Sequence, residues 1–320
     1  MRDFLIDTDT ASDDAVAIIM ALSAPDVRVL ALTTVAGNVG VEQATKNALL
    51  TAEICGSDVP VFKGADAPLG RRHEHAHWFH GRDGLGDRGL EPKRRKPERE
   101  HGVAAIERLV HAHPGLTLVT LGPLTNIAMA VVRDPSIVGK IGRCVVMGGA
   151  PACEGNVTPA AEYNIWVDPE AARFVFRSGV PIEMVGWHVS RGESVLTTDE
   201  IRAIEALGTA KARFAIDSNS TAQAAYHTQT GETGLSLADP TAMAIALDRS
   251  VGLNWSRHRV AIECVSELTR GMTVVDRLNV SRDENNARTW EVLAGDGDGV
   301  DVVWDFDSAR FKAMLKAALA

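Results

Sequence analysis

The stretch Phe4-Leu-Ile-Asp7-Thr-Asp9-Thr-Ala-Ser-Asp13-Asp14 runs directly into Ala15-Val-Ala-Ile-Ile-Met-Ala-Leu22. An apolar run that gives way to four acids and then resumes at helical spacing predicts a buried strand, a turn and a helix that packs back onto the sheet. The acids then lie at the carboxyl end of a strand, which is the edge where open α/β sheets bind their ligands.

The four acids call for a positive partner. Carboxylates this close repel one another, and burying them unpaired is costly. Oxygen ligands favour a hard cation, Ca²⁺ or Mg²⁺, over Zn²⁺. The alternative is that Asp13 and Asp14 only favour the helix N-terminus through its dipole, while Asp7 and Asp9 are solvated turn residues. That alternative accounts for two acids more easily than for four.

Strand and helix patterns alternate along most of the chain. Further buried strands are expected at 27–33, 59–62, 116–120, 144–147 and 182–185, and the intervening segments have helical periodicity. This alternation predicts an α/β fold with a mostly parallel central sheet flanked by helices. Alternating segments at 260–264, 273–276, 289–293 and 300–304, with a turn at 296–299, predict a small antiparallel extension before a last helix at 307–319. Because no repeat or linker interrupts the pattern, we expect one domain over residues 1–320.

The composition and charge of the chain argue against several classes of function. The chain has 320 residues, of which 45% are hydrophobic, and a net charge of −9. An acidic chain is a poor binder of nucleic acid or anionic membranes, and the basic run at 93–96 is flanked by glutamates. We see no signal peptide and no apolar run long enough for a membrane span. With four scattered cysteines and no C-x-x-C pair, the expected location is cytoplasmic.

The segment 64–100 interrupts the alternation. It contains four histidines at 73, 75, 77 and 80. A long irregular segment at the ligand edge of a sheet is typical of a lid that closes over a substrate. The histidines lack the spacing of a transition-metal site, so we interpret the segment as a polar lid.

Several separate stretches together resemble the inosine-uridine-type nucleoside hydrolases. They follow one another in the family's order: Asp7-Thr-Asp9-Thr-Ala-Ser-Asp13-Asp14, Thr33-Thr-Val-Ala-Gly-Asn38, Leu121-Gly-Pro-Leu-Thr-Asn126, Met147-Gly-Gly, Gly155-Asn156, Ala161-Glu162-Tyr-Asn164, Asp168-Pro-Glu-Ala-Ala172, Asp239-Pro240 and Gly271-Met-Thr-Val. A lone D-x-D is weak evidence, whereas this ordered set covers nearly the whole chain.

The resemblance implies the nucleoside hydrolase fold and Ca²⁺-dependent hydrolysis of ribonucleosides to ribose and free base. It implies that Asp9, Asp14, Asp239 and the Leu121 carbonyl hold the calcium, and that Asp9 is the general base for a metal-bound water. Ribose would be held by residues matching the family's sugar site, which are Asp13, Asn38, Met147, Asn156, Glu162 and Asn164. A homodimer or homotetramer is also implied.

Three positions depart from the family's pattern. The usual Pro-Gly after the second acid is Thr10-Ala11, and an often acidic position is His188. Ala238 stands where many members carry a histidine that protonates the leaving base. Losing a general acid costs a factor of about 10² to 10⁴ unless another group replaces it. We expect His80, or Tyr226 or His227, to act instead, or else a leaving group that needs little protonation.

Two other functions compete with this hypothesis. Haloacid-dehalogenase-like phosphatases also place Asp-x-Asp at the end of a first strand, but that pattern needs Thr or Val where this chain has Ala11. A non-catalytic, calcium-dependent ribose or nucleoside binder would retain the sugar site without the histidine that Ala238 replaces. Turnover distinguishes an enzyme from a binder, since only an enzyme releases ribose.

Overall fold

An eight-stranded sheet forms the centre of the fold, and the buried apolar strand β1 (Arg2–Thr8) is one of its inner strands. The strands, whose bounds are given below, follow the order β3-β2-β1-β4-β5-β6-β10-β7. The computed structural model describes residues 1–286, 288 and 299–320. The strands of the main sheet are β1 (Arg2–Thr8), β2 (Val27–Thr34), β3 (Val61–Lys63), β4 (Thr117–Thr120), β5 (Arg143–Met147), β6 (Ile182–Val185), β7 (Gly252–His258) and β10 (Val300–Phe306). A separate two-stranded sheet contains β8 (Val260–Ile262) and β9 (Thr273–Val275).

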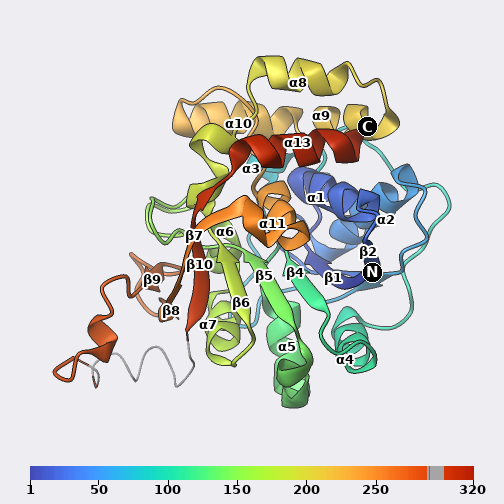
Figure 1. Cartoon of the computed structure of the whole chain (residues 1–320). Coiled ribbons are helices and arrows are strands. Elements are labelled where there is room, and N and C mark those ends of the chain that lie inside the picture. Colours follow the sequence, from blue (N-terminus) through green and yellow to red (C-terminus); the bar gives the residue numbers. More distant parts are fainter. Residues whose placement is uncertain (287, 289–298) are drawn as a thin grey trace.

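Helices connect the strands and cover both faces of the sheet. They are α1 (Ser12–Ser23), α2 (Val41–Ile54), α3 (His77–His80), α4 (Gly102–Ala112), α5 (Thr125–Arg133), α6 (Tyr163–Val167), α7 (Pro169–Arg177), α8 (Thr198–Glu205), α9 (Ala210–Ser218), α10 (Ser220–Thr230), α11 (Ala238–Leu247) and α13 (Ser308–Leu319). Helices α1, α2, α11 and α13 lie on one face, with α8, α9 and α10 beyond them, and α4, α5 and α7 lie on the other (Figure 1). The sheet therefore separates two hydrophobic cores.

The predicted α/β class with a mostly parallel sheet is confirmed. Strands β1 to β6 pair in parallel, and β8 pairs with β9 in the antiparallel sense. The polar lid prediction falls on the segment 64–100, which is irregular apart from the short helix α3 and an isolated bridge from Glu98 to Phe62. The segment at 197–226, expected to be helical, forms three helices, α8 to α10.

Two details at the C-terminal end of the sheet differ from expectation. The segment predicted at 300–304 is β10, which pairs in parallel with β6 and in the antiparallel sense with β7. β7 itself was not predicted, because its sequence Gly-Leu-Asn-Trp-Ser-Arg-His lacks apolar alternation and it lies at the sheet's edge. The strand predicted at 289–293 and most of the turn predicted at 296–299 lie outside the described residues.

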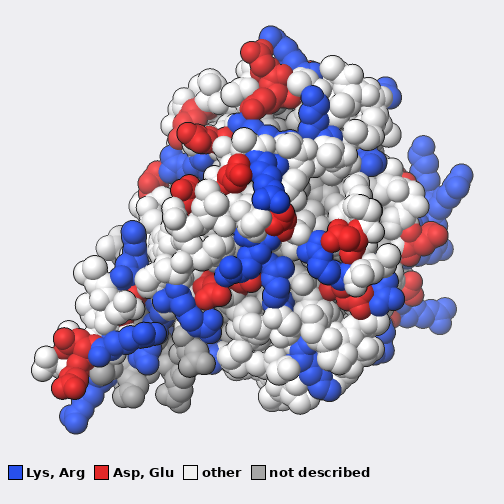
Figure 2. Space-filling view, in the orientation of Figure 1, with Lys and Arg blue, Asp and Glu red and all other residues white. Residues whose placement is uncertain are grey.

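The surface and the helices add two observations. Basic and acidic side chains are mixed over the face shown in Figure 2, where they lie among uncharged residues. Among residues 1–286, 288 and 299–320, no helix combines the length and the apolar character that crossing a bilayer requires.

Candidate active site

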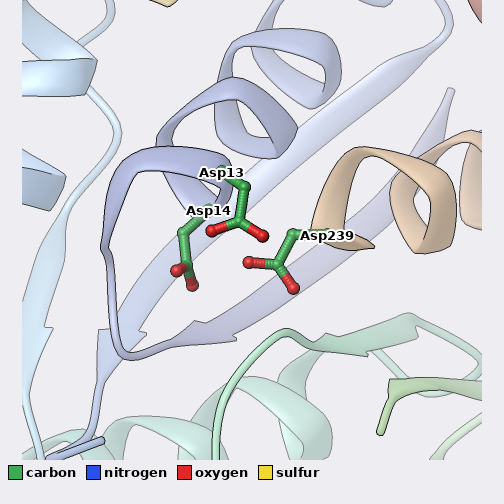
Figure 3. Close-up of side chains that lie close together, drawn as sticks. All are labelled: Asp13, Asp14 and Asp239. Atoms are coloured by element: carbon green, nitrogen blue, oxygen red, sulfur yellow. The ribbon is translucent and has the colours of Figure 1, made fainter. Parts of the chain in front are cut away.

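Three aspartates from two helix N-termini converge at the carboxyl end of the sheet. Asp13 and Asp14 lie in the first turn of α1, and Asp239 lies in the first turn of α11. Their side chains point toward one another (Figure 3), and one carboxylate oxygen from each lies within 4.8 Å of the others. Asp14 and Asp239 are buried. Residues more than 200 positions apart thus form one acidic cluster beside the first strand.

Asp9 lies in the turn between β1 and α1 and is fully buried. Its Oδ2 accepts the backbone N–H of Asn38 at 2.6 Å. Its Oδ1 is buried and accepts no hydrogen bond from any described residue. Two glycines border the carboxylate: a Cβ at Gly37 would lie 2.0 Å from Oδ2, and one at Gly122 would lie 2.8 Å from Oδ1. The family-like Gly37-Asn38 and Leu121-Gly122 pairs therefore make room for Asp9.

The other two acids of the turn are held by different partners. Asp14 accepts the Thr8 hydroxyl at 2.5 Å and the Ala11 N–H at 2.8 Å. Asp7 accepts hydrogen bonds from Thr33 and Asn126, and Asn126 also donates to a backbone carbonyl of β2. Asp7 therefore joins the ends of β1 and β2 to α5, and it has a structural place that the sequence alone did not indicate.

Burial and the charges of neighbouring carboxylates raise the pKa of Asp9, Asp14 and Asp239. Burial raises the pKa of Asp14 to about 6, and the neighbouring Asp13 charge adds to the shift. Burial also raises the pKa of Asp9 and of Asp239 well above the usual range, with further contributions from the other carboxylates. A bound cation would reverse these shifts. Because buried oxygens of Asp9 and Asp13 accept no hydrogen bond from the residues that the structure describes, the donor set fits a hard divalent cation.

Three of the residues expected to bind sugar, Met147, Glu162 and Asn164, form a second wall of the pocket. The Asn164 amide donates to the Leu121 carbonyl at 2.8 Å and to the Met147 carbonyl at 3.2 Å. The Glu162 carboxylate accepts three backbone N–H groups, from Gly149, Asn164 and Ile165. The carbonyl expected to bind calcium is thus already oriented by a side chain that also faces the pocket.

A pocket with about 540 Å³ of empty space lies between these walls. Its lining includes most of the expected site residues, namely Asp13, Asn38, His80, Leu121, Met147, Asn156, Glu162, Asn164 and Asp239. Ala238 lines it as well. Asp9 and Asp14 lie beneath the lining as the buried residues described above.

Several lining residues were not assigned a role from the sequence. They are Ala76, Trp78, Phe79, Val157, Tyr163, Trp187 and Gln229. The sequence offered a partial signal for Trp78 and Phe79, which directly precede His80, and for Tyr163, which lies inside the Glu162–Asn164 motif. Gln229 carried no signal, because its helix is polar on most sides and only the tertiary fold turns it toward the pocket.

The candidate acids for the leaving group have different locations. His80 is buried, its Nδ1 is 2.9 Å from the Ser12 hydroxyl, and it lies 3.8 Å from Asp13. Burial lowers the pKa of His80. His227 is exposed, its Nδ1 is 3.0 Å from the Glu232 carbonyl, and it is not among the lining residues. The Tyr226 hydroxyl donates to Glu232. Of the three, the structure brings only His80 to the pocket.

A family model, curated relatives and solved structures resemble this chain. The sequence model of the family described as "Inosine-uridine preferring nucleoside hydrolase" matches residues 4–313. "Inosine-uridine preferring nucleoside hydrolase" of Crithidia fasciculata is 37% identical over 87% of this chain and 89% of its own. "Uridine nucleosidase 1" of Arabidopsis thaliana is 47% identical over 58% of this chain, and the match spans about half (56%) of that protein. "Purine-Preferring Ribonucleoside Hydrolase from Gardnerella vaginalis", a solved structure, has a TM-score of 0.89 and 31% identity, covering 99% of this chain and 98% of its own.

Proposed function

The chain belongs to the inosine-uridine preferring nucleoside hydrolase family, and we propose that it hydrolyses the N-glycosidic bond of ribonucleosides in a Ca²⁺-dependent reaction. The observation that carries the proposal is the cluster of Asp13, Asp14 and Asp239 at the pocket, with the buried Asp9 beside it. A phosphatase of the haloacid dehalogenase type would not need Asp239 or the wall of Glu162 and Asn164.

The proposed cation site uses oxygen atoms of four residues. Asp9, Asp14, Asp239 and the Leu121 carbonyl would hold the ion, and Asp13 is close enough to join them. When bound, Ca²⁺ would lower the pKa of a water molecule and bind the ribose hydroxyls. The carboxylates themselves surround the position where positive charge develops on the ribosyl group, and so they stabilise the transition state.

Asp9 is suited to accept a proton from the attacking water. The Asn38 N–H fixes Oδ2, which leaves Oδ1 without a hydrogen-bond partner among the described residues. As the water oxygen bonds to C1′, the C1′–N bond breaks and its electron pair goes to the base. The proton from the water goes to Asp9.

His80 is our candidate for protonating the departing base. It lines the pocket, and burial lowers its pKa while the Asp13 charge opposes that shift. Protonated His80 would therefore be a stronger acid than an ordinary imidazolium, and a minority species at neutral pH. His227 and Tyr226 are weaker candidates, because neither lines the pocket.

The test is a ribose-release assay with and without Ca²⁺ on inosine, adenosine, guanosine, uridine, cytidine and nicotinamide riboside. We expect Asp9→Asn to lose a factor of about 10² to 10⁴ in kcat while its fold survives. Asp26→Asn, an exposed carboxylate far from the pocket, is the matched control and should keep full activity.

Two outcomes would contradict the proposal. Near-normal turnover by Asp9→Asn would reject Asp9 as the base. If the wild-type protein releases no ribose from any substrate but is stabilised by Ca²⁺ and nucleoside together, a ribose or nucleoside binder becomes the better function.

A further inference from the structure

Two segments that lie far apart in the sequence form part of the rim of the pocket. The first is the loop 151–157, which contributes Asn156 and Val157 to the lining. The second is 226–232, the last turn of α10 and the residues after it, which contributes Gln229. The Gln229 amide donates to the Asn156 carbonyl, so the two segments meet at the pocket. We call them the loop rim and the helix rim.

A single arginine is ion-paired to both rims. Arg191 donates through Nη1 to Glu154 of the loop rim and through Nη2 to Glu232 of the helix rim, the latter at 3.1 Å. The other carboxylate oxygen of Glu232 accepts the Tyr226 hydroxyl. The Arg191 side chain is 22% exposed, so water screens these contacts only in part.

The backbone that carries Arg191 is itself well anchored. Arg191 lies between two 3₁₀ helices, η2 (Trp187–Ser190) and η3 (Gly192–Ser194). The Ser190 carbonyl accepts the Ser236 hydroxyl at 2.9 Å, and Leu196 pairs with Leu235. Trp187, four residues earlier, lines the pocket. Arg191 therefore extends from a fixed base next to the site toward two rim segments.

The chemistry of arginine suits this place. A planar guanidinium presents donors in two directions at once, whereas a lysine ammonium is a single point charge on a flexible chain. Arg191 does not line the pocket, so it acts on substrate only through the segments it joins.

We propose that Arg191 is a positioning residue that holds the loop rim and the helix rim together, and thereby keeps Asn156 and Gln229 in place for the substrate. This inference rests on the proposed function. Without the ion pairs the rims separate for part of the time, and the apparent affinity falls in proportion to the fraction that stays closed. The chemical step on bound substrate is unaffected, because Arg191 touches none of the reacting groups.

The test compares Arg191→Met with the wild-type protein at low and high ionic strength. Methionine keeps an unbranched side chain and removes the charge. We expect KM to rise about three- to tenfold at low salt with kcat within a factor of two. Added salt should raise the wild-type KM toward that of the variant and change the variant little. Arg191→Lys should fall between the two.

Arg202→Met is the matched control, because Arg202 is an exposed arginine paired with Asp199 in α8. Its KM should equal the wild-type value at both ionic strengths. Hydrogen exchange supplies a readout that needs no turnover: Arg191→Met should exchange faster in 151–157 and 226–232 and unchanged in the central sheet.

Three results would overturn the inference: an unchanged KM, a loss of kcat in step with a lower melting temperature, or unchanged exchange in both rims. If Arg191→Met does not fold, Glu154→Gln removes the loop-rim ion pair from an exposed position and is read in the same way. If the wild-type protein releases no ribose, the proposed function fails, and the exchange experiment still tests the clamp between the rims.

Discussion

At the residue scale, the room around Asp9 is the tightest constraint in the site. The backbone at Gly37 and Gly122 passes so close to the carboxylate that a methyl group at either position would overlap it. Gly37 also precedes Asn38, whose N–H fixes Asp9 Oδ2. The glycines of these two motifs are thus explained by close approach to the acid that we assign as the base.

Gly37→Ala should therefore damage the site without unfolding the protein. Its Cβ would lie 2.0 Å from Asp9 Oδ2, so either Asp9 or the 37–38 backbone must move. A displacement of about 1 Å can cost roughly 10²-fold in rate, and we expect a loss of that order in kcat.

The matched control for this substitution is Gly40→Ala, three residues further along. A Cβ there has nothing within 4 Å, and the backbone is in an ordinary extended conformation. Full activity is expected for Gly40→Ala. Equal activity of the two variants in the ribose-release assay would show that a methyl group at position 37 does not disturb the Asp9 carboxylate.

Single residues also show where sequence reasoning stopped. The acids at 9, 13 and 14 could be predicted to cluster, because one strand end and one helix start place them together. Asp239 could be added only through the family resemblance, since α11 lies more than 200 residues away. His80 and His227 looked equivalent in the sequence. Only the tertiary fold separates a buried pocket residue from an exposed one.

At the scale of elements, Asp168 links helix α7, the start of helix α5 and the lid segment 64–100. It caps α7 by accepting the Ala171 N–H at 3.1 Å, and Pro169 follows it at the start of the helix. Its other oxygen accepts the Thr125 hydroxyl at the start of α5 and the Leu69 N–H in the lid segment. The cap was predictable from local sequence, whereas the two tertiary contacts were not.

Asp168→Ala should cost about 3 kcal/mol of unfolding free energy. About 1 kcal/mol comes from the lost cap. Roughly 2 kcal/mol more comes from leaving the buried Thr125 hydroxyl and the Leu69 N–H without their acceptor. Urea denaturation would measure the change.

Asp307→Ala provides the comparison, because Asp307 caps α13 through the Arg310 N–H and has no comparable buried partners among its described contacts. We expect a cost of about 1 kcal/mol there. If the two substitutions prove equally costly, the contacts of Asp168 to Thr125 and Leu69 add nothing to stability.

The strands likewise differ in how well the local sequence predicts them. The parallel strands β1, β2, β4, β5 and β6 were predictable because burial on both faces makes them continuous apolar runs. The edge strand β7 has polar residues on its exposed side and resembles a loop in sequence. Because β7 was not predicted from the sequence, the antiparallel partner of β10 was unknown. The position of β10 in the main sheet could therefore not be inferred.

At the scale of the whole molecule, the acidic site should oppose folding unless a cation is bound. Burial raises the pKa of Asp7 to about 7 and that of Asp14 to about 6, and it raises the pKa of Asp9 and Asp239 well above the usual range. An acid whose pKa is higher in the folded state binds protons more tightly there than in the unfolded chain. Folding is then favoured at low pH, and the contribution of Asp14 and Asp7 is lost as the pH rises from about 4 to about 6 and about 7, respectively.

The metal-free protein should therefore melt at a lower temperature at about pH 8 than at about pH 5.5, and Ca²⁺ should remove most of that difference. Ca²⁺ binds the ionised carboxylates, so its stabilising effect must be larger at the higher pH. At a concentration about a hundredfold above Kd it contributes about 2.7 kcal/mol, or roughly 4 °C in Tm. Thermal unfolding in EGTA and in CaCl₂ at both pH values measures the effect of pH and the effect of Ca²⁺ on the melting temperature.

Asp239→Asn should lose the calcium shift and melt higher than wild type in EGTA at about pH 8, because one of the repelling charges is gone. A calcium shift that is the same at both pH values, or that survives in Asp239→Asn, would mean that the ion binds elsewhere.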